Sequence, residues 1–592
     1  METNIGIDFG STYSMFSSYT KSSDAVSGIQ AENGNVYIPS VACKDEFGDL
    51  QLGEEARNVM RSVPDLSPYR AFKMLLHEED QEKILKYGYH DISPKSVASE
   101  FLTKYLKICA EELGVSQFDN AVICVPEHWT KGYVTMSGRS RLLNICKKIQ
   151  GEEGTPLLKK IRVVTEPVAA TAYYVHNYKK VNGTPYEGDV IVVDYGGGTL
   201  DVTLTTVRAH DGKQGSGMEI DAFYRTGVGE NHKEGQIGDG GLAYMEEVTR
   251  RALKAAGFGD PKMDGIFLRA KDDLESKLIS GTRKLHNRIQ QRYRLSLEKL
   301  KEDHEVFDTI PYKGKKVEVT YSLLYAVFRD LIQPKLVKCL KEVQEKLDGR
   351  TKLTNNKVKL AIVGGFGQFP LVQKAVWQFF DNRNTVLDIT QGAQGGRQDA
   401  ISFGAALIAA GQISVRLTAK HSIGLRTFRN GLPTFRFALK CGQTVECNKV
   451  YPLGGAWGDP LVYDGSSEDP ELAPWVFAVN DDPKDFKYAI KLVPMKKVSK
   501  ELADDVENQM GLFWKEMRNQ GCPVGSKAYF FGFSMNESEL YTLHIFAKDP
   551  VTRKRVEKAI IQRDLGDFPA IFGPNVEYGF GKDNKNRLEY IE

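Results

Sequence analysis

Two aspartates in this sequence stand between an apolar strand and a glycine-containing turn, a combination suited to binding phosphate and a metal ion. At the second of them, residues 190–193 are a β-branched run that predicts a strand buried on both faces. Asp194 follows the run, and Gly196, Gly197 and Gly198 predict a turn too tight for residues with a Cβ. Residues 200–205 then alternate apolar and polar, which predicts a second strand.

The residue types around this turn indicate its chemistry. Backbone N–H groups exposed by such a turn form a nest for an anion. The Asp194 carboxylate is placed to hold a divalent cation against a bound phosphate, and Thr199 supplies a hydroxyl at the other edge. A single glycine-rich turn is weak evidence, because many such turns are ordinary hairpins.

A matching hairpin lies at the start of the sequence. Residues 5–7 are followed by Asp8, and then by the turn residues Gly10, Ser11, Thr12 and Tyr13. Two Asp-containing hairpins far apart in one chain predict two similar half-domains that face each other across a nucleotide.

A third segment completes the pattern: residues 360–363 are apolar, Gly364 and Gly365 follow, and Pro370 begins a predicted helix. Together the three segments resemble the two phosphate motifs and the adenosine motif of the superfamily of actin, sugar kinases and heat-shock chaperone ATPases. Within it, the chain resembles the 70-kilodalton heat-shock (DnaK-type) chaperones as a divergent member. The resemblance implies an α/β fold, with two similar actin-like lobes around a nucleotide cleft and a β-rich, sandwich-like C-terminal domain.

Two other phosphate-binding folds fit poorly. A dinucleotide fingerprint opens a helix after its glycines, whereas here a strand follows. The sequence contains no GxxxxGK[ST] motif.

Further positions take their roles from the resemblance alone. Lys73 matches the chaperone lysine that reaches the transferred phosphate, and Glu166, in TEPVAATAYYV, matches the glutamate that borders the attacking water. Gly238 lies where these chaperones carry a glycine pair. Glu298 and Lys301 have the Glu-x-x-Lys spacing of the residues that contact adenosine in the family. Glu275 and Lys277 lie nearby in a similar sequence context.

The adenosine motif departs from the family pattern. The family has a small hydroxyl residue after Gly-Gly and an arginine that stacks on adenine, whereas this chain has Phe366 and Gln368. Phe366 is a candidate replacement for the stacking group. We expect ATP to be preferred over GTP, with modest affinity.

The expected site therefore divides into catalytic, metal and nucleotide residues. Lys73, Glu166, Asp194 and Thr199 are the expected catalytic residues, and Asp8 and Asp194 the expected Mg²⁺ ligands, mostly through water. The residues expected to bind ATP or ADP are Gly10, Ser11, Thr12, Tyr13, Gly196, Gly197, Gly198, Gly238, Glu298, Lys301, Gly364, Gly365, Phe366, Gly367 and Gln368.

Composition narrows the classes of partner. With 592 residues the chain is long enough for several subdomains, and its net charge of +2 gives no argument for nucleic acid or a membrane surface. The eight cysteines have no zinc-ligand spacing and suit a reducing compartment. Strand residues begin at Asn4, so no signal peptide is expected, and no apolar run is long enough to span a bilayer. We expect a cytoplasmic location.

The chain divides into four parts by its sequence pattern. Residues 1–411 form the expected ATPase domain, 412–418 a linker, 419–565 a β-rich domain that resembles the chaperone peptide-binding sandwich, and 566–592 a polar tail. The linker has Arg416 among apolar residues, where the family has an acidic, leucine-rich linker. A helical lid is absent or reduced to residues 556–563.

These observations predict a chaperone-like protein that binds ATP and hydrolyses it slowly with Mg²⁺. Its nucleotide state would be weakly coupled to a protein client, or an exposed polypeptide segment, bound by the C-terminal domain. A co-chaperone or exchange factor is a candidate further partner. The alternatives are a sugar or metabolite kinase on the same fold, which needs a carboxylate base for its acceptor, and an actin-like scaffold.

Overall fold

The structure is a computed structural model whose described residues form two units. Residues 1–128 and 141–415 make the first unit, and residues 129–140 and 416–592 make the second. The description leaves out residues 1, 32–33, 64–65, 67, 77, 79–80, 131–135, 152–153, 210–217, 230–237, 262–264, 294–295, 352–357, 382–385, 390–398, 420–421, 430–431, 441, 458–460, 463–474, 480–527, 550, 553, 560, 567–588 and 591–592. Each unit is described by itself.

The first sheet of the first unit has the strand order β3-β2-β1-β8-β9, with β4 paired to β2. Strands β1, β2 and β3 form an antiparallel meander, whereas β8 and β9 extend it in parallel from β1. Their bounds are β1 Asn4–Asp8, β2 Tyr13–Thr20, β3 Ala25–Gly28, β4 Tyr37–Pro39, β8 Phe118–Val125 and β9 Leu158–Thr165. A small sheet of β5 (Val41–Lys44), β6 (Leu50–Leu52) and β7 (Tyr69–Arg70) lies in the same half of the unit.

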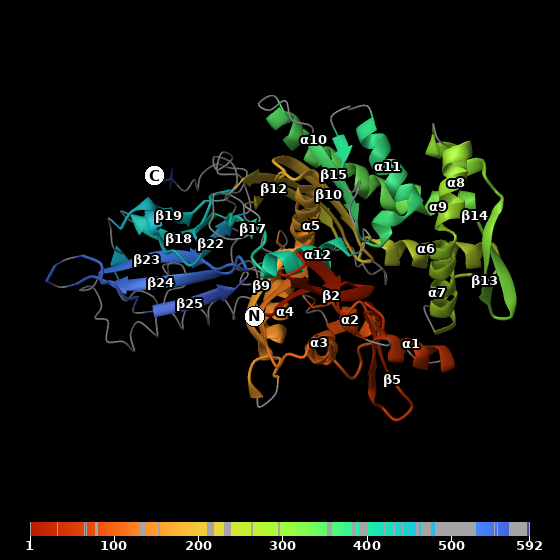
Figure 1. Cartoon of the computed structure of the whole chain (residues 1–592), viewed down its shortest axis with the longest axis horizontal. Helices are drawn as coiled ribbons and strands as arrows, with labels where there is room; N and C mark the ends of the chain where they lie inside the picture. Colours follow the sequence, from red (N-terminus) through yellow and green to blue (C-terminus); the bar gives the residue numbers. More distant parts are fainter. Residues whose placement is uncertain are drawn as a thin grey trace. The chain divides into compact units, whose positions relative to one another are not determined.

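The second sheet repeats this arrangement, in the order β16-β15-β10-β11-β12-β17. Strands β10 (Gly188–Tyr195), β11 (Leu200–Ala209) and β12 (Met218–Val228) form the antiparallel meander. Strands β15 (Val358–Val363) and β16 (Val386–Asp388) extend it in parallel from β10. The repeat confirms the two similar halves that the matching hairpins predicted, and each hairpin belongs to its own sheet. Strand β2 of the first sheet and strand β10 of the second are labelled in Figure 1.

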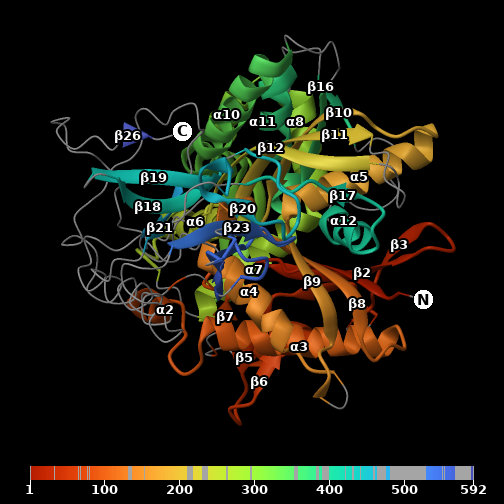
Figure 2. The same cartoon turned by 90° about the vertical axis from the view of Figure 1, so that its left-hand side faces the viewer.

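Two helices connect the halves. Helix α12 (Ala400–Ala409) packs on β1, β2 and β8 of the first sheet, and α5 (Glu166–Asn182) packs on β10 and β11 of the second. The two helices cross very closely, since a Cβ added at Gly404 would lie 1.7 Å from the Ala169 carbonyl oxygen. Helix α3 (Pro94–Glu112), labelled in Figure 2, begins after the Ser93 cap, and its buried residues include Val97, Phe101 and Tyr105. The remaining helices of this half are α1 (Gly53–Ser62), α2 (Gln81–Lys86) and α4 (Met136–Lys148).

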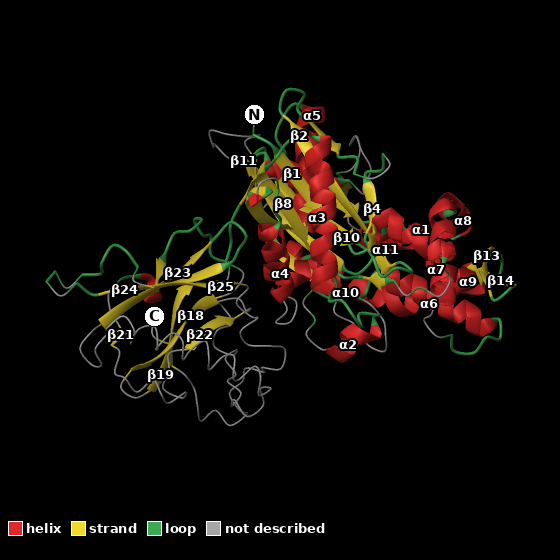
Figure 3. Cartoon of the chain, turned by 90° about the horizontal axis from the view of Figure 1, so that it is seen from below, coloured by secondary structure: helices red, strands yellow, loops and turns green. Residues whose placement is uncertain are grey.

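A mainly helical subdomain is inserted between β12 and β15. Figure 3 shows its helices beside a two-stranded hairpin. The helices are α6 (Gly241–Ala255), α7 (Gly265–Ser280), α8 (Thr282–Arg292), η4 (Leu297–Glu302), α9 (Tyr321–Val327), η5 (Phe328–Ile332) and α10 (Gln333–Thr351), and the hairpin strands are β13 (Val306–Tyr312) and β14 (Lys315–Thr320). After β15 come η6 (Phe366–Gln368) and α11 (Pro370–Asp381), the helix predicted to begin at Pro370.

The second unit is rich in strands. One sheet has the order β22-β18-β19-β26, and the other β20-β23-β24-β25, with β21 paired to β23. Their bounds are β18 Ser422–Arg429, β19 Leu432–Leu439, β20 Tyr451–Pro452, β21 Leu461–Val462, β22 Trp475–Val479, β23 Ala528–Met535, β24 Tyr541–Ala547, β25 Ile561–Gly566 and β26 Glu589–Tyr590. The sandwich itself stays a prediction, and residues 480–527 of the expected β-rich domain lie outside the described residues.

Two features of this unit bear on the expectations from sequence. A helical lid was expected to be absent or reduced to residues 556–563, and within that range residues 561–563 belong to strand β25, which pairs with β24. The unit also includes residues 129–140, from the N-terminal half of the chain. There Arg139, at the start of α4, pairs at 2.7 Å with Glu539 in the β23–β24 turn, and both side chains are buried. Strand periodicity cannot predict this pair, because it joins residues far apart in sequence.

Candidate functional site

The N-terminal hairpin places Asp8 at the end of β1, opposite Met15 of β2. A Cβ added at Gly10 would lie 2.0 Å from the Tyr13 carbonyl oxygen, so the turn requires glycine there. Ser11 and Thr12 follow on the turn, with half-buried side chains. Within the described residues their N–H groups have no hydrogen-bond partner, which leaves them available to an anion.

The second hairpin is fixed by the loop that precedes α6. The carbonyl groups of Gly196, Gly197 and Gly198 accept hydrogen bonds from the N–H groups of Gly241, Leu242 and Asp239, at 3.1, 2.8 and 2.8 Å. A Cβ at Gly238 would lie 2.3 Å from the Gly198 carbonyl oxygen, so the two loops approach more closely than other residues permit. The N–H groups of Gly197 and Gly198 have no partner among the described residues. The carbonyl groups are therefore occupied and these amides are available for phosphate.

The two hairpins meet each other. A Cβ added at Gly197 would lie 2.1 Å from Thr12 Oγ1, and one at Gly198 would lie 3.0 Å from Ser11 Oγ. Segments nearly two hundred residues apart thus supply hydroxyls and amides to one place.

A buried ion pair lies beside the hairpins. Lys73 Nζ donates to Glu166 Oε1 at 2.5 Å, and the two side chains are 2% and 9% exposed. Lys73 follows β7 in a turn, and Glu166 is the first residue of α5, so the pair joins two separate elements. Asp8 and Asp194 are close enough that their charges affect the same groups.

The pKa shifts show that several acidic groups lie close together in this cluster. Burial, and then the charge of Glu166, raise the pKa of Asp8 to about 7, although Lys73 opposes the shift. Burial, followed by the charges of Glu166, Asp201 and Asp8, raises the pKa of Asp194 well above its ordinary value. Burial alone would lower the pKa of Lys73, but Glu166 and Asp8 outweigh it and the pKa is raised. The cluster thus has more acids than cations and favours an added positive charge.

Asp201 belongs to this cluster and was not among the expected site residues. It lies directly opposite Asp194 in the hairpin register and is fully buried. The alternating pattern placed Asp201 on the polar face of its strand, on the opposite side from the apolar residues. The pattern could not show that this polar face would be buried.

The residues present fit a magnesium ion. The Asp194 Oδ2 atom is buried and has no hydrogen-bond partner in the described part of the chain. Among the described residues no group of three or more His, Cys, Asp or Glu side chains forms a metal site. Mg²⁺ needs fewer protein ligands, because it commonly binds one or two carboxylates and completes its shell with water and phosphate. Asp8 and Asp194 are suited to that role.

The predicted adenosine motif is placed beside the second hairpin, but its side chains face inward. Gly364 has a positive φ of 78°, and a Cβ there would lie 2.5 Å from Asp194 Oδ1. Phe366 is buried among other aromatic rings. Gln368 Nε2 donates to the Ile362 carbonyl at 3.1 Å. Gly365 and Gly367 complete the turn between β15 and α11.

Glu298 and Lys301 lie on η4, in the helical subdomain. Their side chains are 76% and 44% exposed and 4.0 Å apart, and the intervening Leu300 is buried in the core. No described contact brings them to the hairpins. Glu275 lies on α7, where its carboxylate is 3.7 Å from Lys271 Nζ.

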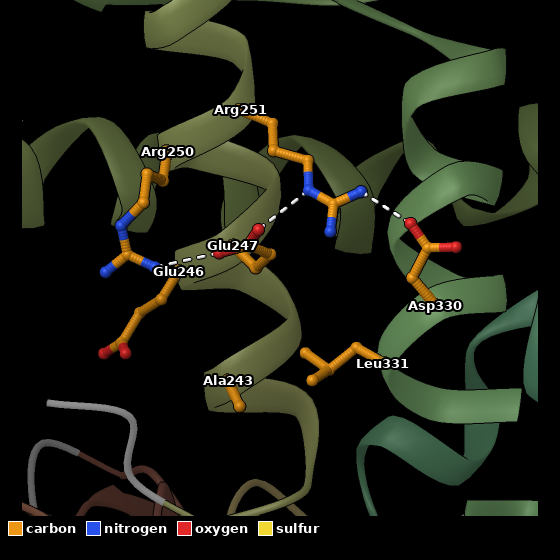
Figure 4. A pocket seen from close by; sticks show the side chains of 7 residues that line it. All are labelled: Ala243, Glu246, Glu247, Arg250, Arg251, Asp330 and Leu331. Carbon is orange, nitrogen blue, oxygen red and sulfur yellow. Dashed lines mark hydrogen bonds and ion pairs between the residues drawn. The ribbon is translucent and has the colours of Figure 1, made fainter. Parts of the chain in front are cut away.

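A cavity of about 220 Å³ lies on α6 and η5 (Figure 4). Ala243 and Leu331 are its apolar lining residues. Glu247 pairs with Arg250 and Arg251, Arg251 also pairs with Asp330 at 2.8 Å, and Glu246 pairs with Arg70 outside the cavity. Because these charges are already neutralised, the cavity is a weaker candidate for phosphate than the hairpins. Among the described helices, none is both long and apolar enough to cross a membrane.

Comparisons with known proteins agree with this geometry. Residues 67–214, which include Lys73, Glu166, Asp194 and the glycine turn, match the family described as Hsp70 protein. The chain is 27% identical over 438 residues to heat shock 70 kDa protein 13 of Rattus norvegicus, an alignment that covers 65% of this chain and 84% of the relative. It is 26% identical to the Mus musculus protein of the same name, with the same coverage. It is 24% identical to heat shock cognate 70 kDa protein 3 of Dictyostelium discoideum, over 69% of this chain and 60% of the relative.

Proposed function

The chain is a divergent member of the Hsp70 family, and from that premise we propose that it binds ATP and ADP with Mg²⁺ and hydrolyses ATP slowly. The observation that carries the proposal is the meeting of two phosphate-binding hairpins, with their free amides, around the buried Lys73–Glu166 pair and the Asp8 and Asp194 carboxylates. In this family such a site is generally an ATPase.

Each group has a proposed role. The turn amides and the hydroxyls of Ser11 and Thr12 hold the phosphates. Asp8 and Asp194 hold the ion, which when bound neutralises charge on the phosphate oxygens. Lys73 stabilises charge that develops on the transferred phosphate, while Glu166 and Thr199 orient the attacking water. The Lys73–Glu166 pairing suits water attack better than a sugar or metabolite kinase, whose acceptor needs a free carboxylate base.

The second part of the proposal concerns client binding by the C-terminal domain. The C-terminal β-rich domain binds a protein client or an exposed polypeptide segment weakly, and nucleotide changes that binding little. A co-chaperone or exchange factor is a further proposed partner. The proposed compartment is reducing and contains ATP, such as the cytoplasm. Buried cysteine thiols at Cys43, Cys109 and Cys146 are compatible with it.

The test is Asp194→Asn. The substitution removes a buried charge that already repels Glu166, Asp201 and Asp8, so we expect the fold to be kept. Single-turnover ATP hydrolysis should fall by about 100-fold or more, as when one preorganised electrostatic group is removed from an active site.

The matched control is Asp189→Asn, the same change at the opposite end of the same strand. It should hydrolyse ATP at the wild-type rate. Wild-type turnover by Asp194→Asn would refute the site assignment, and phosphorylation of a small hydroxyl acceptor would favour the kinase.

A further inference from the structure

The segment after β15 lies next to the proposed phosphate site, as the strand pairing shows. Strands β10 and β15 are parallel neighbours, and Asp194 is paired with Val363 at their carboxyl ends. Ligands of open α/β sheets bind outside the carboxyl ends of such strands. A ligand that extends from the phosphate site along this edge of the sheet therefore meets residues 364–368, since a Cβ at Gly364 would lie 2.5 Å from Asp194 Oδ1.

An aromatic cluster occupies this place. We define it as Tyr195, Tyr244, Phe366 and Phe369. The Phe366 ring stacks on Phe369, with centroids 5.4 Å apart and planes at 13°. It meets Tyr195 edge-on at 5.0 Å and Tyr244 at 5.2 Å. Only 6% of Phe366 is exposed.

The same ring covers the beginning of α6. A Cβ added at Gly241 would lie 3.1 Å from Phe366 Cβ and Cγ, so the ring lies against the first residue of that helix. Gln368 is also occupied, because its amide donates to the Ile362 carbonyl and its oxygen accepts from Gln373 at 3.0 Å. The Phe366 ring therefore presents no open face to a base, and the Gln368 amide is held by Ile362 and Gln373.

We infer that this site selects the magnesium-bound triphosphate group and is indifferent to the base, with Phe366 as the residue that determines this specificity. The inference rests on the proposed function and replaces the preference for ATP over GTP expected from sequence. Stacking of a base on an aromatic ring contributes about 5- to 150-fold in affinity. A buried Phe366 removes that contribution from ATP and GTP alike.

The test is calorimetric titration of the full chain with ATP, GTP and inorganic tripolyphosphate, each with Mg²⁺. The three dissociation constants should agree within about fivefold, the lower end of a stacking contribution. ATP binding more than about tenfold tighter than both other ligands would overturn the inference and leave the proposed function standing. Absence of binding by all three would overturn both.

Phe366→Ala tests the residue itself. The change uncovers the Phe369 face on which a base can stack, so ATP should gain about fivefold or more over tripolyphosphate. The control Phe369→Leu keeps Phe366 over Gly241 and should leave the ratio unchanged. An unchanged ratio in Phe366→Ala would refute the role of Phe366. If that variant does not fold, the wild-type comparison of three ligands still decides the inference.

Discussion

Lys73 and Glu166 connect the chemistry of the site to the stability of the fold. Both are almost fully buried, so each neutralises a charge that would otherwise lie unpaired inside the protein. Removing one partner of such a pair leaves an uncompensated buried charge, which costs about 3–5 kcal/mol of stability.

Lys73→Met should therefore lower the free energy of unfolding by about 3–5 kcal/mol. Glu166→Gln should lower it by less, because the nearby Asp8 carboxylate still opposes the charge of Lys73. The double variant should lose less than the sum of the two. Urea denaturation of the four proteins gives the coupling energy directly. Lys104→Met, which breaks the more exposed pair with Glu55, is the control and should cost less than about 1 kcal/mol. Losses in the Lys73 and Glu166 variants no larger than in this control would contradict the prediction.

His176 on α5 gives the molecule a pH dependence away from the site. Burial lowers its pKa, Asp24 opposes the shift, and Lys180 and Lys179 reinforce it. Its ring also meets Tyr19 edge-on. The unfolded chain binds a proton on this histidine near pH 6.5, and the folded chain only at lower pH. The stability contributed by neutral His176 is therefore lost as pH falls below about 6.5.

We expect His176→Gln to reduce the loss of stability between pH 7.5 and pH 5.5, measured by urea midpoints. Asp8 acts in the opposite direction, because its folded pKa of about 7 lies above its ordinary value and stability falls as pH rises toward 7. The difference between variant and wild type isolates the histidine. An identical pH response in both proteins would show that His176 does not titrate differently on folding.

At the scale of elements, the glycines of the second hairpin permit close packing of two loops, besides their proposed role in binding phosphate. A Cβ at Gly240 would lie 2.6 Å from the carbonyl oxygens of both Gly196 and Gly197. Backbone atoms cannot rotate away as a side chain can, so the loop or the hairpin must shift.

Gly240→Ala should destabilise the protein by about 1–3 kcal/mol, the usual cost of overpacking, and weaken nucleotide binding because the turn amides move. Gly365→Ala, in the neighbouring turn, meets nothing within 4 Å and should change stability little. Thermal unfolding and calorimetric titration compare the two. Equal behaviour would mean that the close approach of the loops does not constrain the hairpin.

At the scale of the whole molecule, the linker is anchored on both sides. Ser414 and Val415 form β17, which pairs in parallel with β12 of the first unit, and Ile413 is buried. In the second unit the Leu417 carbonyl accepts from the Val445 N–H at 2.9 Å. Because Arg139 and Trp129 belong to that unit and are buried, residues 416–592 alone would lack part of it. Measurements of client binding therefore need the full chain.

We expect the affinity for an unstructured client peptide to differ by less than about fivefold between ATP and ADP, below the range of ordinary allosteric coupling. Fluorescence anisotropy of a labelled peptide with the full chain measures both affinities. Ile413→Asp, which removes a buried anchor of the linker, should leave the ratio unchanged if coupling is already small. A ratio above about 50-fold in the wild type would show a working nucleotide switch.

The sequence by itself determined the two hairpins and predicted a phosphate and metal site at them. Strand alternation, glycines at tight turns and the carboxylates of Asp8 and Asp194 are local features, since each depends on residues only a few positions apart. The start of α11 at Pro370 also follows from a local pattern. The completed sheets do not, because β1 pairs with β8 and β10 pairs with β15, strands that are distant in sequence. Lys73 and Glu166 came from family resemblance, and only the fold shows that they meet, 93 residues apart.

Tertiary structure alone decided which side chains are available. Phe366 was expected to reach a base and is enclosed by rings from α6, β10 and the end of its own turn. Glu298 and Lys301 have the expected spacing, yet η4 carries them on the surface of the helical subdomain. Asp201 has the pattern of a strand's polar face and is fully buried. Burial depends on what packs against a residue from distant parts of the chain. The local periodicity of apolar and polar residues holds no information about those contacts.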